Sequence, residues 1–178
     1  MSSIGQPWRW SFRADPRALP LADRHYTRQK PGSAQFVPPG RCVVLLTEPA
    51  DALWVTSWPI AAYVRHAWAG AMVCSLFRRE PHCEHRASDL IVAACAATRA
   101  HWPDLPDLGM VTFVDPGKTR RKRDPGRCFR RAGFRPVGHT EGGLVALQLL
   151  PADFPAAVAA RPRYTHGQLA LFDVGAAA

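Results

Sequence analysis

The sequence predicts a mixed α/β fold built on a single β-sheet. Short apolar runs of strand length, bounded by proline and glycine, lie before and after one longer segment of helical periodicity. A strand, a crossover helix and another strand in that order indicate a parallel pair, whereas the shorter connections elsewhere favour hairpins. The chain of 178 residues has the length of one domain with a tail.

The first half of the chain contains candidate strands and one short helix. Trp8 to Arg13 alternates aromatic and polar residues, which is typical of a half-buried strand. We expect a helix over Leu19 to Arg28, because Lys30-Pro31-Gly32 would stop it soon afterwards. Three apolar runs separated by turn residues then predict strands over 42–47, 52–58 and 72–77.

A longer helix is predicted after these strands. Apolar residues recur at helical spacing from Ser88, the candidate N-cap, to Trp102. The next predicted strand covers 110–114 and ends at the turn that begins with Asp115.

The last elements are a short helix and a hairpin. The helix covers 125–132 and closes on Gly133 as a C-terminal cap. Strands over 135–139 and 144–150 form the hairpin. Little periodicity follows Pro151, so we expect a domain over 1–150 and a tail over 151–178.

Charge and cysteine content limit the functional classes. The formal net charge of +9 and the pI near 10.1 favour a polyanionic partner, although a GC-rich genome also enriches arginine. The five cysteines are odd in number and lack paired spacing, which indicates reduced thiols. No apolar run reaches membrane-spanning length and no apolar leader is evident, so we expect a cytoplasmic protein without a membrane partner.

Positive charge is concentrated in one segment. Nine basic residues lie between positions 118 and 135, and Asp124 is the only acid among them. The basic residues are Lys118, Arg120, Arg121, Lys122, Arg123, Arg127, Arg130, Arg131 and Arg135. Such a segment is often a solvated face, but its self-repulsion falls when phosphates neutralise it. We therefore predict contact with nucleic acid, extended by Arg28 and Lys30, and the resemblances described next imply that it is double-stranded DNA.

The C-terminal segment carries a short apolar motif. Gln168-Leu169-Ala170-Leu171-Phe172 resembles the pentapeptide by which many bacterial and phage DNA enzymes bind the DNA polymerase sliding clamp. Apolar side chains exposed on a tail are a liability unless a groove receives them. The resemblance implies clamp binding by residues 168–172, through Gln168, Leu169, Leu171 and Phe172. The alternative is a tail that packs back on its own domain.

A second resemblance concerns the whole domain. The order of elements, and the segment Cys128-Phe129-Arg130-Arg131-Ala132-Gly133-Phe134-Arg135-Pro136-Val137-Gly138, resemble the GNAT acyltransferase superfamily. That resemblance implies a GNAT-like mixed sheet with flanking helices. Two features depart from the family: the stretch 78–88 lacks the glycines of the acyl-CoA loop, and Phe129 replaces the usual tyrosine acid. Acetyl-CoA is therefore a doubtful donor, and the sequence does not name another.

Within that superfamily, the chain is most similar to the phage Mom-like DNA-modification proteins. His25-Tyr26 resembles their His-Tyr pair, and Asp115 resembles their active-site aspartate. The resemblance implies that these three residues are catalytic, that they surround a metal, with iron expected, and that the substrate is a DNA base, with adenine expected. Imidazole, phenolate and carboxylate groups suit iron. Without a metal, they would serve as general base, hydrogen-bond donor and orienting carboxylate.

Structural alternatives exist for these residues. A His-Tyr pair can close a helix, and an aspartate can cap a turn. A flipped adenine would also need aromatic partners, for which Trp54, Trp58 and Phe36 are candidates, although such residues more often lie in a core.

The predicted function is DNA base modification by an acyltransferase-like enzyme tethered to the replication clamp. The alternatives are a non-catalytic DNA-binding accessory protein and a conventional N-acyltransferase.

Overall fold

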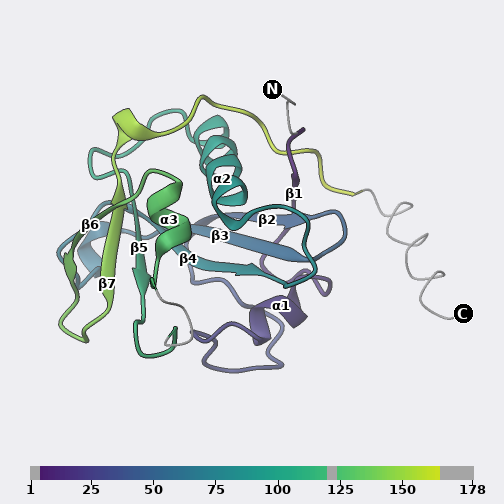
Figure 1. The fold of residues 1–178 in the computed structure, drawn as a ribbon, viewed down its shortest axis with the longest axis horizontal. Helices are drawn as coiled ribbons and strands as arrows, with labels where there is room; N and C mark the ends of the chain where they lie inside the picture. The colour runs from purple at the N-terminus through teal and green to yellow at the C-terminus, as the bar shows by residue number, and fades with distance from the viewer. Residues whose placement is uncertain (1–4, 120–123, 165–178) are drawn as a thin grey trace, which may run out of the picture.

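A seven-stranded mixed sheet forms the centre of the computed structural model, which describes residues 5–119 and 124–164 (Figure 1). Across the sheet the strands are β1 (Trp8–Trp10), β2 (Arg41–Thr47), β3 (Ala52–Trp58), β4 (Met72–Arg79), β5 (Met110–Val114), β7 (Val145–Leu149) and β6 (Arg135–His139). Neighbouring strands are antiparallel except for β4 and β5, which are parallel. The predicted mixed α/β sheet is therefore confirmed.

Two helices cover opposite faces of the sheet because alternate side chains of a strand point to opposite sides. Helix α2 (Ala87–His101) connects β4 to β5 and packs its buried Leu90 and Ile91 in the same cluster as Val43 of β2. Helix α1 (Leu19–Asp23) packs in a second cluster with Val44, the next residue of β2. Each fully buried aliphatic side chain contributes roughly 1.5–3 kcal/mol to this packing.

Two predicted helix boundaries were wrong. The N-cap of α2 is Arg86 rather than Ser88, and it makes no side-chain cap hydrogen bond. Helix α1 ends at Asp23, so the predicted continuation to Arg28 is a turn. The Asp23 carboxylate accepts the Gly32 N–H at 2.9 Å and so folds the following chain back on the helix. These changes place His25 and Tyr26 in a loop.

Helix α3 (Arg127–Arg131) follows β5; it is shorter than the predicted 125–132, but Gly133 follows its C-cap and closes it as predicted. Gly133 has φ +101°, and the next residue, Phe134, donates its N–H to the carbonyl of Phe129 at 3.0 Å. No helix within the two described ranges has both the length and the apolar character needed to cross a membrane.

The segment after β7 belongs with the domain as far as Tyr164. Phe154, Ala160 and Tyr164 are buried, and Arg161 forms a parallel bridge with Arg9 beside β1. Figure 1 shows this segment passing over the end of α2 toward β1. The segment from residue 151 to Tyr164, which was predicted to be part of the tail, therefore packs on the domain.

The parallel strands β4 and β5 separate along their length. They pair only over Met72–Cys74 and Met110–Thr112, whereas β4 continues to Arg79. The pairing of β4 with β3 is also shifted at this point, and Ser75 is the extra residue of the irregularity. The separation opens the sheet at the carboxyl ends of two adjacent strands.

Candidate functional site

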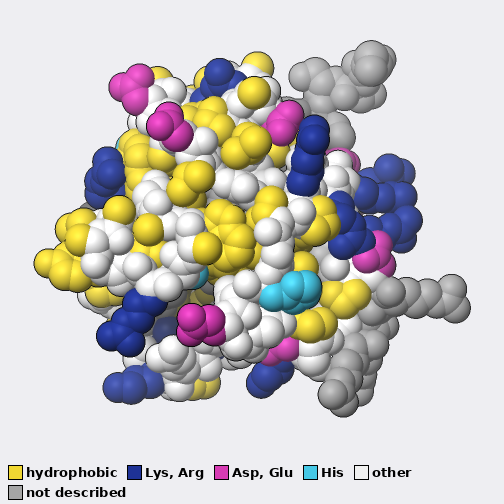
Figure 2. Space-filling view, turned by 90° about the vertical axis from the view of Figure 1, so that its left-hand side faces the viewer, with side chains coloured by type: hydrophobic (Ala, Val, Ile, Leu, Met, Phe, Trp, Pro, Cys, Tyr) yellow, Lys and Arg dark blue, Asp and Glu magenta, His cyan; other side chains and the backbone are white. Residues whose placement is uncertain are grey.

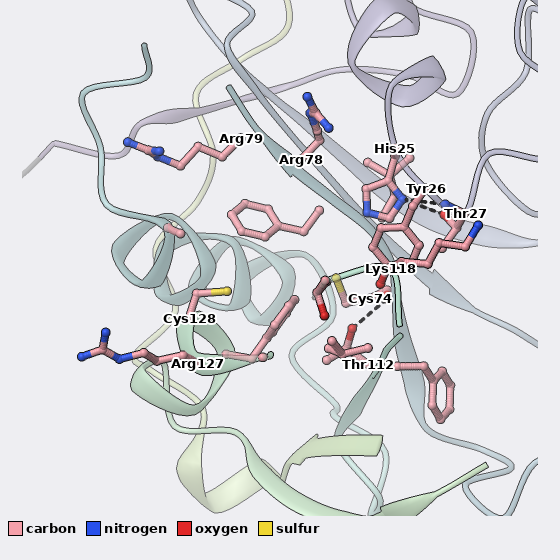
Figure 3. Close-up of a pocket in the computed structure, with 18 of the residues that line it drawn as sticks. His25, Tyr26, Thr27, Cys74, Arg78, Arg79, Thr112, Lys118, Arg127 and Cys128 are labelled. Carbon is pink, nitrogen blue, oxygen red and sulfur yellow. Dashed lines mark hydrogen bonds between the residues drawn. The ribbon is translucent and has the colours of Figure 1, made fainter. Parts of the chain in front are cut away.

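A cleft of about 1050 Å³ occupies the space where β4 and β5 separate (Figure 3). Its walls come from the turn after α1, the second half of β4, the start of α2, the end of β5 and helix α3. Phe77 and Phe129 contribute an apolar wall, with ring centroids 6.0 Å apart. Ligands in open α/β sheets bind at the carboxyl ends of strands, which is where this cleft lies.

His25 and Tyr26 enter the cleft from the turn after α1. Their rings stack with centroids 4.6 Å apart. The Thr27 backbone N–H donates to His25 Nδ1 at 3.3 Å, and the Thr27 Oγ1 lies 2.7 Å from the same nitrogen (Figure 3). Burial lowers the pKa of His25 to about 4, aided by the Arg78 guanidinium and opposed by a hydrogen bond to the Phe77 backbone. The imidazole is therefore neutral at neutral pH, with Nδ1 as an acceptor.

Tyr26 connects this turn to the end of β5. Burial raises the pKa of Tyr26; a hydrogen bond from the Asp115 backbone N–H lowers it, and the negative charge of Asp115 raises it. The phenol therefore stays protonated at neutral pH. With 38% of its surface exposed, Tyr26 can donate its O–H to a bound molecule.

Asp115 begins the turn that follows β5. Its Oδ1 accepts the backbone N–H groups of Gly117 at 2.8 Å and Lys118 at 3.2 Å. Asp115 also lines a second pocket together with Tyr26. The carboxylate thus caps its own turn and faces the same region as the tyrosine, so the structure brings His25, Tyr26 and Asp115 together around one opening in the sheet.

These three residues fit a preassembled iron site poorly. His25 Nδ1 and Asp115 Oδ1 already accept backbone hydrogen bonds, and Tyr26 is held as a phenol. Within the part of the chain that the structure describes, no group of three or more His, Cys, Asp or Glu side chains is arranged to hold a metal ion. Iron binding at this site stays a prediction.

Part of the predicted DNA-binding segment also lines the cleft. Lys118, Arg127 and Arg131 face it, and Lys30 is exposed elsewhere on the surface. Arg130 instead forms an ion pair with Asp124. The remaining predicted contacts, Arg120, Arg121, Lys122 and Arg123, lie outside the described residues.

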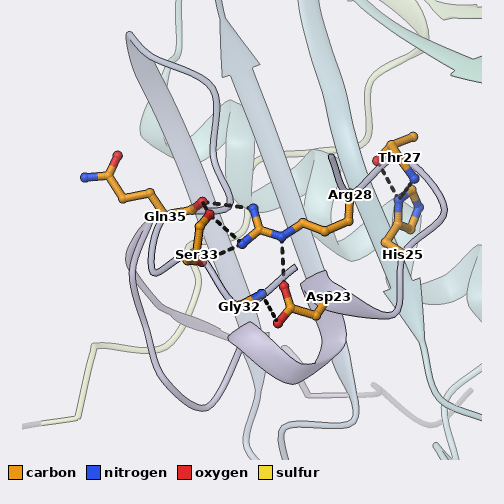
Figure 4. A network of polar contacts seen from close by, with 7 residues as sticks. All are labelled: Asp23, His25, Thr27, Arg28, Gly32, Ser33 and Gln35. Atoms are coloured by element: carbon orange, nitrogen blue, oxygen red, sulfur yellow. Dashed lines mark hydrogen bonds and ion pairs between the residues drawn. The ribbon is translucent and has the colours of Figure 1, made fainter. Parts of the chain in front are cut away.

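Arg28 has a structural role, contrary to the expectation of a DNA contact. Its guanidinium donates to Asp23 Oδ1 at 2.8 Å and to the carbonyls of Gln35 at 2.9 Å and Ser33 at 2.5 Å (Figure 4). Only 9% of its side chain is exposed. Arg28 therefore holds the loop after α1 in place, and its donors are not available to a phosphate.

Four further arginines lie at the cleft that sequence reasoning did not assign to it: Arg24, Arg78, Arg79 and Arg86. Arg24 and Arg78 both bind Glu80 Oε1, at 2.9 Å and 3.1 Å, so one carboxylate fixes two cations beside His25. Arg79 donates to the carbonyls of Cys83 and His85, which braces the glycine-free loop before α2. The feature of the sequence that could have identified these arginines is the Arg78-Arg79 pair at the end of an apolar run.

The charge is unevenly distributed over the surface. Figure 2 shows the side of the molecule near β6, where apolar side chains occupy the centre and Lys and Arg lie around the margin. Among the described residues, the Lys and Arg side chains on this side do not form a continuous patch. The cleft, by contrast, has lysine or arginine on several of its walls.

The aromatic residues suggested as partners for a base do not reach the cleft. Trp54 is fully buried and Phe36 is 7% exposed, so both belong to the core. Trp58 packs against Trp102 and carries the Arg41 guanidinium on its ring. Apolar and aromatic patterning cannot distinguish such residues from a binding surface.

No protein-family model, curated protein or solved structure matches this chain. The clamp-binding motif at 168–172 lies outside the described residues. The function of the cleft therefore has to be inferred from its own residues and geometry.

Proposed function

We propose that the protein is a GNAT-like transferase that modifies a base of DNA in the cleft between β4 and β5. Three features support this proposal. The order of elements that resembles this superfamily recurs in the structure, including the crossover helix α2. The two parallel strands separate to open a cleft. Lysine and arginine side chains line that cleft, which suits a polyanionic substrate.

The observation that carries the proposal is the contact between Tyr26 and Asp115 at this opening. The Asp115 backbone N–H binds the protonated phenol, and both side chains line the same pocket, although the two residues come from segments far apart in sequence. A proton donor and a proton acceptor at one opening in the sheet are what group transfer to an amine requires. Phe129 stands at the position where the superfamily usually has a tyrosine acid, and it has no proton to give. Tyr26 would supply that acid instead.

The proposed reaction uses an activated acyl donor and the exocyclic amine of the base. The amine nitrogen bonds to the acyl carbon, the bond from that carbon to the leaving group breaks, and Asp115 Oδ2 takes the amine proton. The Tyr26 hydroxyl gives a proton to the leaving group, and exchange with solvent restores both residues. Both acceptor contacts of His25 Nδ1 are made to Thr27, so His25 orients Tyr26 by stacking rather than acting as the base.

Mass spectrometry of nucleosides from cells that express the protein tests this function. DNA from these cells should contain a deoxynucleoside of increased mass, absent from cells with empty vector. Tyr26→Phe keeps the stacked ring but removes the donated proton, so the modified nucleoside should fall at least tenfold, as loss of acid catalysis predicts. Unmodified DNA at full expression of folded protein would contradict the proposal.

The second candidate is a non-catalytic DNA-binding accessory protein. The hydrogen bonds from Gly117 and Lys118 to Asp115 favour it, because they give Oδ1 of this carboxylate a structural role. For either function, we propose that residues 168–172 tether the protein to the sliding clamp.

A further inference from the structure

A second pocket of about 410 Å³ adjoins the cleft. Phe113 and Lys118 belong to both cavities, as does Tyr26, so the two spaces meet at these side chains. Leu144 and Asp115 line the second pocket only. Phe113 and Leu144 supply apolar surface and Asp115 and Lys118 supply polar groups, and this combination is usual for a small-molecule site.

The Phe113 ring is held in a fixed orientation by two aromatic neighbours. Its centroid lies 4.9 Å from that of His66 and 5.8 Å from that of Trp68, with interplanar angles of 56° and 59°. His66 Nδ1 accepts the backbone N–H of Trp68 at 3.2 Å, which fixes this pair in turn. Phe113 itself is only half-buried. A braced ring with a partly exposed surface is suited to stacking with a planar group.

We propose that this second pocket receives the target base after it leaves the DNA duplex, and that Phe113 is its stacking platform. This inference rests on the proposed function and names the place of the substrate. Base-modifying enzymes have to extrude the base to reach its atoms, and they hold it by stacking and by hydrogen bonds to its edge.

The polar groups of the pocket agree with this occupant. Asp115 Oδ1 is engaged by its own turn, but the described residues give Oδ2 no hydrogen bond. That oxygen can accept a hydrogen bond from an exocyclic amine, which is the group proposed to react. Lys118 is exposed at the junction of the two cavities, where it can bind the phosphate of the extruded nucleotide.

The alternative is that Phe113 only packs. It does contact a small cluster formed by Ala71, Val111 and Ala146. Packing alone requires bulk and apolar character, whereas base stacking requires an aromatic ring. Leucine at position 113 separates these two roles.

The test compares the binding of two DNA duplexes that differ at one position. One duplex carries an adenine opposite an abasic site, so that the base extrudes easily, and the other carries an abasic site in both strands. The full-length protein should bind the first duplex roughly tenfold more tightly, in line with the usual contribution of one stacked base. Phe113→Leu should remove this preference and leave affinity for the second duplex unchanged, whereas Phe113→Trp should retain it.

Phe12→Leu provides a matched control, because Phe12 is half-buried and contacts Arg163 instead of the pocket. Equal preference in the wild type and in Phe113→Leu, or no preference in the wild type, would overturn the inference. Modified nucleosides in cells test the enzyme function separately. If cells contain the modified nucleoside whether or not Phe113 is replaced, the proposed function holds and the base pocket does not. If the protein prefers the adenine duplex but modifies no DNA, the base pocket holds and the protein is a non-catalytic accessory protein.

Discussion

The burial and hydrogen bonding of Tyr26 depend on the fold around it. The resemblance of His25-Tyr26 to the Mom-like pair made Tyr26 a candidate, but the residue pattern alone also fits a tyrosine that closes a helix. The structure ends α1 at Asp23, turns the chain and places the phenol against the end of β5. His25 stacks on it, and the loop that carries both is fixed by Arg28.

The lowered pKa of His25 predicts a dependence of stability on pH. Its folded pKa of about 4 lies below the ordinary histidine pKa of 6.5, so the unfolded chain binds more protons between these values. The stabilising contribution is therefore complete above about pH 6.5 and is lost as the pH falls toward 4. Urea denaturation at pH 7 and pH 4.5 should show a loss on the order of 1–2 kcal/mol more in wild type than in His25→Gln. The same pH dependence in both proteins would show that His25 is solvated.

At the scale of elements, the strands could be predicted from sequence, whereas the opening between β4 and β5 could not. β3 and β5 have the predicted bounds because apolar residues and turn signals mark both ends. The separation of β4 from β5 has no such signal, since it depends on strand register and on the irregularity at Ser75. The Arg86 N-cap was missed because sequence patterns identify N-caps by a side chain that can cap the helix, and Arg86 makes no such hydrogen bond.

The position of β5 depends on a glycine. Gly109 has φ +60°, and a Cβ there would lie 2.0 Å from the carbonyl oxygen of Leu149 in β7. Gly109→Ala should therefore lower the free energy of unfolding by roughly 2–4 kcal/mol, measured by denaturation. Gly143→Ala is the control, because φ is +82° but no atom lies within 4 Å, so only about 1 kcal/mol should be lost. Equal losses would mean that the approach of β5 to β7 is not constrained at Gly109.

For the whole molecule, composition predicted a polyanionic partner without locating it. In the structure, some basic residues, such as Arg28 and Arg130, form ion pairs within the protein, whereas others face the cleft. A count of charges along the chain cannot make this distinction, because it depends on which carboxylates and carbonyls lie nearby.

Binding of DNA should weaken steeply with salt, because phosphate contacts release counterions. Arg127→Glu combined with Arg131→Glu removes two cations at the cleft, and should reduce the slope of log affinity against log salt by roughly 2. Arg65→Glu is the control for a single charge reversal outside the cleft, since Arg65 is exposed but does not line the cleft. Titrations at several salt concentrations would measure the slope. An unchanged slope in the double variant would place the DNA elsewhere.

The C-terminal motif gives an independent prediction about partners. Replacing Leu171 and Phe172 by alanine removes the apolar anchors, each contributing roughly 1.5–3 kcal/mol when fully buried in a groove. Co-purification with the sliding clamp should disappear, while the thermal melting of the domain should not change. Clamp binding by the double variant at wild-type strength would refute the tether.

The claim that the cleft acts on DNA is tested most directly by Asp115. Nucleoside mass spectrometry should be performed on DNA from cells expressing the wild type, Asp115→Asn or Asp107→Asn. Asp107 is an exposed aspartate outside both cavities, so its variant should yield as much modified nucleoside as the wild type. Asparagine at position 115 can still cap the turn but cannot take the amine proton, so modification should fall about a hundredfold or more. Full modification by Asp115→Asn would contradict the proposed chemistry and leave the carboxylate with its structural role alone.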